Sequence, residues 1–388
     1  MSAAATLIAP WRGLPRTVWV LVAARAVNRI GAFSLSFLAI VLTVEFGASL
    51  SRTGLVVALF GLATIPSRLL GGVLADRIGR RRTIVLGLTG CAAAQLWIAA
   101  STTLWSAMVA AIVLGLAFEI YEPPSQATIA DVTEPLDRPA AYGLQGSAMA
   151  VAGVLAGLLA AAVSHWDLRW LFVADAITCL ACAGLVARAL PRDVRRERVR
   201  AGGIAVWRDH RLLLLLASGT VFATIYMQLI VGVPLTLLEQ GLPASGTGII
   251  LAVSAVTMIL AQRLLRVQLD DFQAMRVGYV LLAAGLVVCA FATSLPVFLL
   301  ATAFWSVGET FLLTRYLTQA AGLAPDDGRA RYLAVFGLCW GVATTAAPLI
   351  VTHLLETVGP AGLWLVNAAA AIALAAAQPL LRTRLARA

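Results

Sequence analysis

The sequence predicts an all-α membrane protein with twelve transmembrane helices in two pseudo-symmetric six-helix bundles. The chain is 61% hydrophobic and only 12% charged, with a mean hydropathy of +0.90, whereas a soluble domain carries roughly 25% charged residues. Apolar runs of about 20 residues, long enough to cross a bilayer as a helix, recur along the whole chain. The longest polar interruption falls near the middle, which indicates two halves.

Each half contains six apolar runs, and each run is long enough for one crossing. The first six occupy residues 17–44, 52–76, 83–101, 104–130, 141–164 and 169–190. The second six occupy residues 211–240, 245–264, 276–293, 296–322, 331–355 and 360–381. Lipid cannot satisfy open backbone hydrogen-bonding groups, so each run is expected to be helical. The runs lack the period-two alternation of transmembrane strands.

A basic segment at residues 191–210 is expected to link an N-terminal bundle (residues 1–190) to a C-terminal bundle (residues 211–388). A shift of 195 residues superimposes three charged positions, which favours an internal repeat. It places Arg68, Asp76 and Arg81 on Arg263, Asp271 and Arg276. A second echo pairs Asp137, Arg138 and Tyr142 with Asp327, Arg329 and Tyr332.

The positive charges predict the orientation. All 29 basic residues are arginines. With both termini in the cytoplasm, 23 of the 29 arginines face the cytoplasm, two face outward and four lie in spans, as the positive-inside rule requires. The net charge of +10 then belongs to the inner face, next to anionic lipid headgroups, and no nucleic-acid partner is needed to explain it. The arginine-only, alanine-rich composition is typical of a GC-rich bacterial genome, so we expect the bacterial inner membrane.

A short charged loop, residues 71–82, lies between the second and third runs and carries five charges. It reads Gly71-Gly72-Val73-Leu74-Ala75-Asp76-Arg77-Ile78-Gly79-Arg80-Arg81-Arg82. This loop resembles the loop between helices two and three of the major facilitator superfamily, whose pattern is G-x-L-A-D-R-x-G-R-R, and every position matches. The resemblance implies a secondary transporter, with the substrate path between two six-helix halves.

The charged loop is expected to latch the cytoplasmic side. Asp76 is poorly placed at its own helix C-terminus, where the dipole is negative. The resemblance nominates the start of helix eleven, near Arg331, as its partner, and Arg80 or Arg81 is expected to meet Asp131. The predicted latch comprises Gly71, Gly72, Asp76, Arg77, Gly79, Arg80, Arg81 and Asp131. The alternative is a purely topogenic loop; Asp76→Asn should cripple turnover only if the latch exists.

Charges inside the membrane each need a partner or a function, because one at mid-bilayer costs about 2.5–3.5 kcal/mol. Arg25 and Arg29 are four residues apart and share one face of helix one, with Asn28 beside them. From the register, with about 1.5 Å per residue, Arg29 should lie at the depth of Glu119 and Arg25 at the depth of Glu122. We therefore expect two ion pairs, which either bind protons or are permanently structural. The proline pair at 123–124 should break the helix there.

In the second half, Glu309 lies near the middle of helix ten without an evident partner. It is expected to serve proton coupling or a cationic ligand, or else to be a neutral, hydrogen-bonded acid. Arg315 lies on a different face, nearer the cytoplasm, where it can snorkel. Tyr226 and Gln228 on helix seven either face the central cavity or pack in the core.

The function indicated is proton-coupled efflux of small organic compounds or drugs by alternating access. The stretch 121–127 resembles the helix-four exit of bacterial drug-efflux members. Two antiporter markers depart from the family pattern: Ala111 stands where an arginine is usual, and the segment 152–157 lacks the proline of G-P-x-x-G-G. Alternatives are a proton-coupled metabolite uptake symporter and a non-transporting membrane sensor. We expect a monomer with no cofactor, no metal site and no enzymatic activity, since the sequence shows no nucleophile, metal cluster or phosphate loop.

Overall fold

The computed structural model describes residues 11, 13–31, 38, 41–42, 45–163, 169–191, 205–242, 245–266, 269–325 and 328–386. Within these residues all regular structure is helical. Nine helices or merged helices there are long and apolar enough to cross a membrane. The merged one, spanning Arg329–Leu385, holds two crossings. With α2 and α8, which lie in the first and fifth predicted runs, each of the twelve predicted runs contains a helix.

Among its described residues, the first half contains seven helices. They are α2 (Arg16–Gly31), α4 (Leu50–Ile78), α5 (Arg80–Ala100), α6 (Leu104–Phe118), α7 (Glu122–Val132), α8 (Arg138–Val163) and α9 (Arg169–Ala189). Helix four of the prediction is split into α6 and α7, and the break falls just before Pro123 and Pro124, as expected. Prolines are tolerated in the first turn of α7 because their missing N–H groups have no helical partner there.

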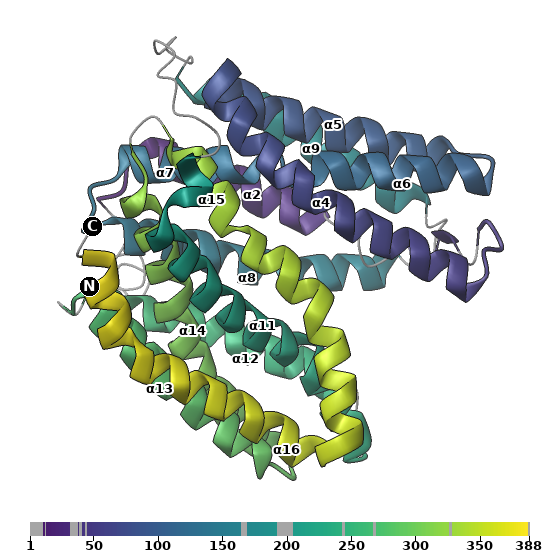
Figure 1. Cartoon of the computed structure of the whole chain (residues 1–388). Helices are drawn as coiled ribbons and strands as arrows, with labels where there is room; N and C mark the ends of the chain where they lie inside the picture. Colours follow the sequence, from purple (N-terminus) through teal and green to yellow (C-terminus); the bar gives the residue numbers. More distant parts are fainter. Residues whose placement is uncertain are drawn as a thin grey trace, which may run out of the picture.

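The second half starts after residues 192–204, the main part of the predicted linker, which lie outside the described residues. Its helices are α10 (Ala205–Arg208), α11 (His210–Glu239), α12 (Ser245–Ala261), η2 (Gln262–Arg266), α13 (Asp271–Ala290), α14 (Leu295–Leu323), α15 (Arg329–Phe336) and α16 (Leu338–Ala386). Gly359, at φ 68° and ψ −179°, interrupts α16, and Pro360 starts the last crossing. Figure 1 shows α16 turning back sharply on itself.

Predicted helix eleven also differs from the expectation of one continuous run. It breaks at Gly337, the single residue between α15 and α16. Glycine is common in transmembrane helices, so nothing in the sequence marked this glycine as a break.

The repeat is visible in matching hydrogen bonds. Arg138 Nε donates to the Ala130 carbonyl at 3.2 Å, and Arg329 Nε donates to the Ala321 carbonyl at 3.2 Å. Each arginine reaches the carbonyl eight residues earlier, at the same turn of its own half. This equivalence supports the predicted duplication.

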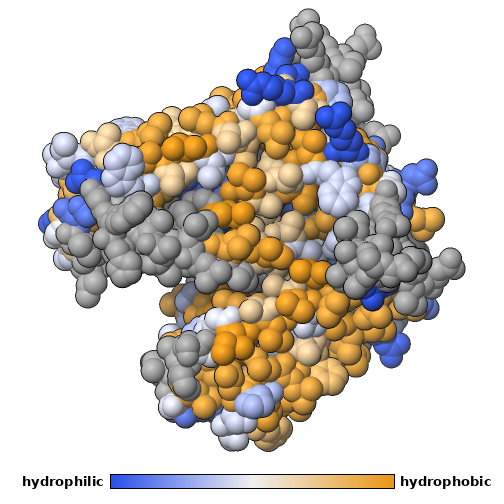
Figure 2. Space-filling view, turned by 180° about the vertical axis from the view of Figure 1, so that it is seen from behind, coloured by the Kyte–Doolittle hydropathy of each residue, from blue (hydrophilic) through white to orange (hydrophobic). Residues whose placement is uncertain are grey.

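The two halves meet at one end and separate toward the other. In Figure 1, α4, α5, α6 and α9 form the upper group, and α11–α14 and α16 form the lower group. Between the halves, α4 contacts α15 and α16, while α8 contacts α12 and α14. Figure 2 shows a notch between the two lobes, with apolar residues covering both and hydrophilic residues near two opposite edges. We call the end at which α4, α7 and α15 meet the latch end.

Candidate functional site

At the latch end, two aspartates of the first half bind arginines of α15. Arg331 Nε lies 2.5 Å from Asp76 Oδ2, so the predicted contact with the start of helix eleven is present. Asp131, at the end of α7, pairs with Arg80 of its own half and with Arg329 of α15. These ion pairs join the end of α4, the start of α5 and the end of α7 to the other half.

Glycines allow the close approach that these pairs need. A Cβ placed on Gly72 would lie 2.8 Å from Ala334 Cβ and 3.1 Å from the Ala330 carbonyl oxygen, so α4 and α15 cross there almost backbone to backbone. A Cβ on Gly71 would collide with the Ile120 carbonyl at the break in helix four. Gly79 links α4 to α5 at φ 96° and ψ 160°, a conformation essentially restricted to glycine.

Two other arginines of the predicted latch differ from Arg80. Arg81 donates to the Ala187 carbonyl at the end of α9. Arg77 is exposed. Of the two arginines proposed for Asp131, the structure therefore selects Arg80. The sequence did not predict Arg329 as the second partner of Asp131, although the internal repeat had matched Arg329 with Arg138.

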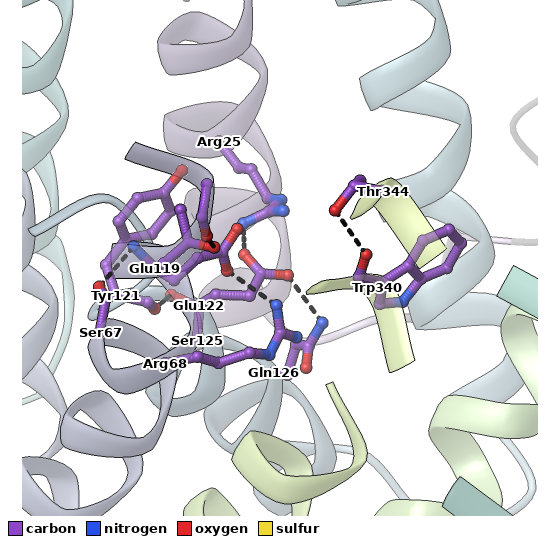
Figure 3. A network of polar contacts seen from close by, with 12 residues as sticks. Arg25, Ser67, Arg68, Glu119, Tyr121, Glu122, Ser125, Gln126, Trp340 and Thr344 are labelled. Carbon is purple, nitrogen blue, oxygen red and sulfur yellow. Dashed lines mark hydrogen bonds and ion pairs between the residues drawn. The ribbon is translucent and has the colours of Figure 1, made fainter. Parts of the chain in front are cut away.

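A network of polar and charged groups fills the break in helix four (Figure 3). Arg25 of α2 pairs with Glu122 of α7, as the register predicted. The second carboxylate oxygen of Glu122 accepts a hydrogen bond from Gln126 Nε2 at 2.7 Å. The Arg25 guanidinium also lies 5.7 Å from the centre of the Tyr121 ring, within the range of a cation–π interaction.

Asn28 supports this network from the same helix. Its Oδ1 accepts a hydrogen bond from the Tyr121 hydroxyl at 3.0 Å, and its Nδ2 donates to Cys179 Sγ at 3.0 Å. Asn28 is buried. It therefore ties α2 to the break in helix four and to α9, and with Arg25 and Tyr121 it borders a small cavity there.

The second predicted pair, Arg29 with Glu119, is wrong. Glu119 Oε2 accepts a hydrogen bond from Arg68 Nη1 of α4 at 2.7 Å. The register argument assumed a regular helix, but the chain leaves the helix at Glu119, and its backbone N–H instead donates to Ser67 Oγ at 3.0 Å. This contact turns Glu119 toward α4. Arg68 is thus a buried partner of an acid.

Arg29 points elsewhere. Its side chain is exposed, and the described residues offer it no ion-pair partner. Both Arg29 and Glu309 lie within electrostatic range of Tyr226, which comes from α11. The Tyr226 ring packs edge-on against Trp340 of α16, with ring centres 5.2 Å apart. Residues of both halves thus approach one another in the region between α2, α11, α14 and α16, which we call the central space.

Glu309 is the fifteenth residue of the 29-residue α14 and is only 4% exposed. Within the described part of the chain it forms no ion pair or side-chain hydrogen bond, which agrees with the sequence. A buried carboxyl group without a cationic partner favours its neutral form.

Two further predictions are resolved in the second half. Gln228 packs in the core, where its Oε1 accepts a hydrogen bond from Asn367 Nδ2 at 3.0 Å. Arg315 does not snorkel to the headgroups: its Nη1 donates to Asp271 Oδ1 at 2.6 Å, and its side chain is 8% exposed. Register alone did not show that the start of α13 supplies this acid. Arg315 and Asp271 line a cavity of about 350 Å³ that also touches Leu136 and Arg138 of the first half.

Comparisons with known proteins agree with this architecture. The family model of the Major Facilitator Superfamily matches residues 21–270. A Bacillus subtilis (strain 168) protein described as "Uncharacterized MFS-type transporter YqjV" is 22% identical, covering 84% of this chain and 83% of that protein. The multidrug resistance protein MdtH of Cronobacter sakazakii is 25% identical, covering 78% of both chains.

Solved structures show the same fold at low sequence identity. The human organic anion transporter MFSD10 (TETRAN) superimposes with a TM-score of 0.77 at 16% identity, covering 94% of this chain and 100% of that chain. The proton:xylose symporter XylE superimposes with a TM-score of 0.73 at 13% identity, covering 93% and 94%. With the family model matched over well over half of its length, this chain belongs to the Major Facilitator Superfamily and is a multi-pass membrane transporter, not an enzyme.

Proposed function

We propose that this transporter exports small, partly apolar organic compounds in exchange for protons, by alternating access in a bacterial inner membrane. The observation that carries the proposal is Glu309. It is buried at the middle of a central helix and has no cationic partner among the described residues, whereas the buried acid Glu122 is paired with Arg25. An acid in this setting changes its charge when the central space changes its water content or its ligand.

The ion pairs of the latch end support the alternating-access part. By the positive-inside rule, the arginine-rich latch end faces the cytoplasm and both termini lie there. The two halves are in contact at the latch end, and the notch between the lobes lies at the opposite end. In this orientation the molecule has the form of an outward-facing state. Protons entering from outside then reach Glu309 before the latch opens.

The lining of the central space supports the substrate class. Tyr226 and Trp340 supply aromatic surface, and Arg29 and Glu309 supply one charge of each sign. Such a surface binds organic compounds through rings and few polar groups. The names of MdtH proteins among the relatives point to efflux in the same way.

The test is proton release from proteoliposomes of the purified protein while cationic and neutral drugs are added. We expect wild type to release protons on ligand addition and Glu309→Gln to lose that release, because an amide cannot carry the proton. Glu356→Gln is the matched control, since Glu356 is exposed on α16. Ligand-driven release that persists in Glu309→Gln contradicts the role of Glu309.

A proton-coupled uptake symporter is the second candidate, favoured by the likeness to the proton:xylose symporter XylE. The two directions differ in one measurement. An imposed inward proton gradient should expel a drug from loaded vesicles under antiport, and should accumulate a metabolite under symport. A protein that moves no solute under any gradient is the sensor alternative.

A further inference from the structure

One face of α4 runs along α15 and the first part of α16, and it joins the two halves. We call this contact the α4 seam, formed by Ile65, Arg68, Gly72 and Asp76 on α4 against Arg331, Ala334, Gly337 and Gly341. The α4 positions are three or four residues apart, so they share one helix face. A Cβ on Gly341 would lie 3.2 Å from Ile65 Cγ1, which extends the close approach from Gly72 along the whole seam.

Arg68 is the charged residue in the interior of this seam. It is 7% exposed, and a methyl group on Gly337 would overlap its guanidinium group. The guanidinium therefore occupies the space that a side chain at the break between α15 and α16 would fill. At the same time its Nη1 donates to Glu119 at the break in helix four. Arg68 thus connects the two helix breaks, one in each half.

Among the charged and titratable groups near Arg68, Glu119 is the anion that holds its guanidinium in place. Arg25 of α2 and Cys91 of α5 lie within electrostatic range of Glu119, as does Tyr121 beside it. From the other half, the buried thiol of Cys339 lies within range of Arg68. Glu122, the other carboxylate of the network, is already paired with Arg25.

Glu119 is also reachable by protons. Its side chain is 26% exposed, whereas that of Arg68 is 8% exposed. A proton that binds a carboxylate oxygen of Glu119 gives a neutral acid and removes the attraction for the guanidinium, which stays charged. A buried guanidinium without an anion is strongly unfavourable. Neutral Glu119 therefore favours withdrawal of Arg68 from the seam, and the seam then loses the group that fills it.

We propose that Arg68 is a positioning residue that couples the charge of Glu119 to the docking of the two halves at Gly337. Ionised Glu119 keeps Arg68 in the seam and the latch end closed, and protonated Glu119 releases Arg68 and favours opening at that end. This rests on the proposed proton-coupled alternating access, and it assigns the step that links proton binding to opening.

The test is the distance between nitroxide labels on Leu136→Cys and Gln273→Cys, one in each half at the latch end. Both positions are exposed, and all five native cysteines are buried. In wild type the fraction with a long distance should rise as the pH falls. Gly337→Ala, whose methyl group displaces the guanidinium, should raise the ratio of open to closed molecules about tenfold, as expected for losing one charge-assisted hydrogen bond. Glu119→Gln should raise it similarly and abolish its pH dependence.

Two controls separate this role from general packing. Gly341→Ala, in the same seam but against Ile65 instead of a guanidinium, should leave the pH profile as in wild type. Gly337→Ala should add nothing in an Arg68→Ala background, where there is no guanidinium to displace. A wild-type pH profile in Glu119→Gln, or full additivity of Gly337→Ala and Arg68→Ala, overturns the proposal. Because the labels report without transport, normal coupling in a protein that releases no protons with any drug would count against the proposed function alone.

Discussion

At the residue scale, Arg25 and Arg29 lie one helical turn apart but have different roles. Arg25 neutralises a buried acid, whereas Arg29 belongs to the central space where we propose that transport takes place. Both were predicted to pair with acids of helix four, and the prediction is confirmed only for Arg25, which meets Glu122. The register of a regular helix correctly predicted the partner of Arg25, because Glu122 starts a new helix, α7, at the expected depth. Register could not place Glu119, which lies in the break itself and turns toward Arg68.

This difference predicts effects of different size on stability for two matched substitutions. Arg25→Ala leaves Glu122 buried without its cation, so the free energy of unfolding should fall by about 3–5 kcal/mol. Arg29→Ala removes an exposed side chain that has no ion-pair partner in the described part of the chain, and its effect on stability should stay within about 0.5 kcal/mol. Unfolding by SDS in mixed micelles measures both. Equal losses in the two variants contradict the assignment of Arg25 as structural and Arg29 as part of the central space.

At the element scale, the functional geometry comes from interrupted helices. The break in helix four was predictable, because Pro123 and Pro124 cannot continue a helix from the preceding turn. The break at Gly337 was not predictable in this way, since the group that fills the space beside that glycine, the Arg68 guanidinium, comes from the other half. A single sequence shows residues that interrupt a helix locally, such as proline, but it does not show which distant side chain packs at the interruption.

Gly79 provides a test at this scale. Its φ of 96° turns the chain from α4 directly into α5, and its N–H donates to the Ala75 carbonyl at 3.2 Å. Gly79→Ala should lower the free energy of unfolding by about 1–3 kcal/mol, the usual cost of such a strained backbone. Gly61→Ala is the control, because a Cβ there meets nothing within 4 Å, and it should stabilise α4 by roughly 0.5–1 kcal/mol. If Gly79→Ala is as stable as wild type, the tight turn does not hold the loop in shape.

At the scale of the whole molecule, the two halves are held together asymmetrically. On one side, α4 and α15 are joined by the Asp76–Arg331 pair and by the α4 seam. On the other side, Asp271, the repeat equivalent of Asp76, pairs with Arg315 of its own half and borders the cavity of about 350 Å³. The repeat was visible in the sequence, but this divergence was not, because it depends on which partner each acid reaches in three dimensions.

The central claim is that transport requires the latch end to open and close. The most direct measurement joins Leu136→Cys to Gln273→Cys with a cross-linker that a reducing agent cleaves, and follows drug-driven proton release in proteoliposomes. Each single-cysteine variant, treated in the same way, controls for modification alone. We predict that release stops on cross-linking and returns after reduction, while both single-cysteine variants stay active. Undiminished release from fully cross-linked protein would contradict the account.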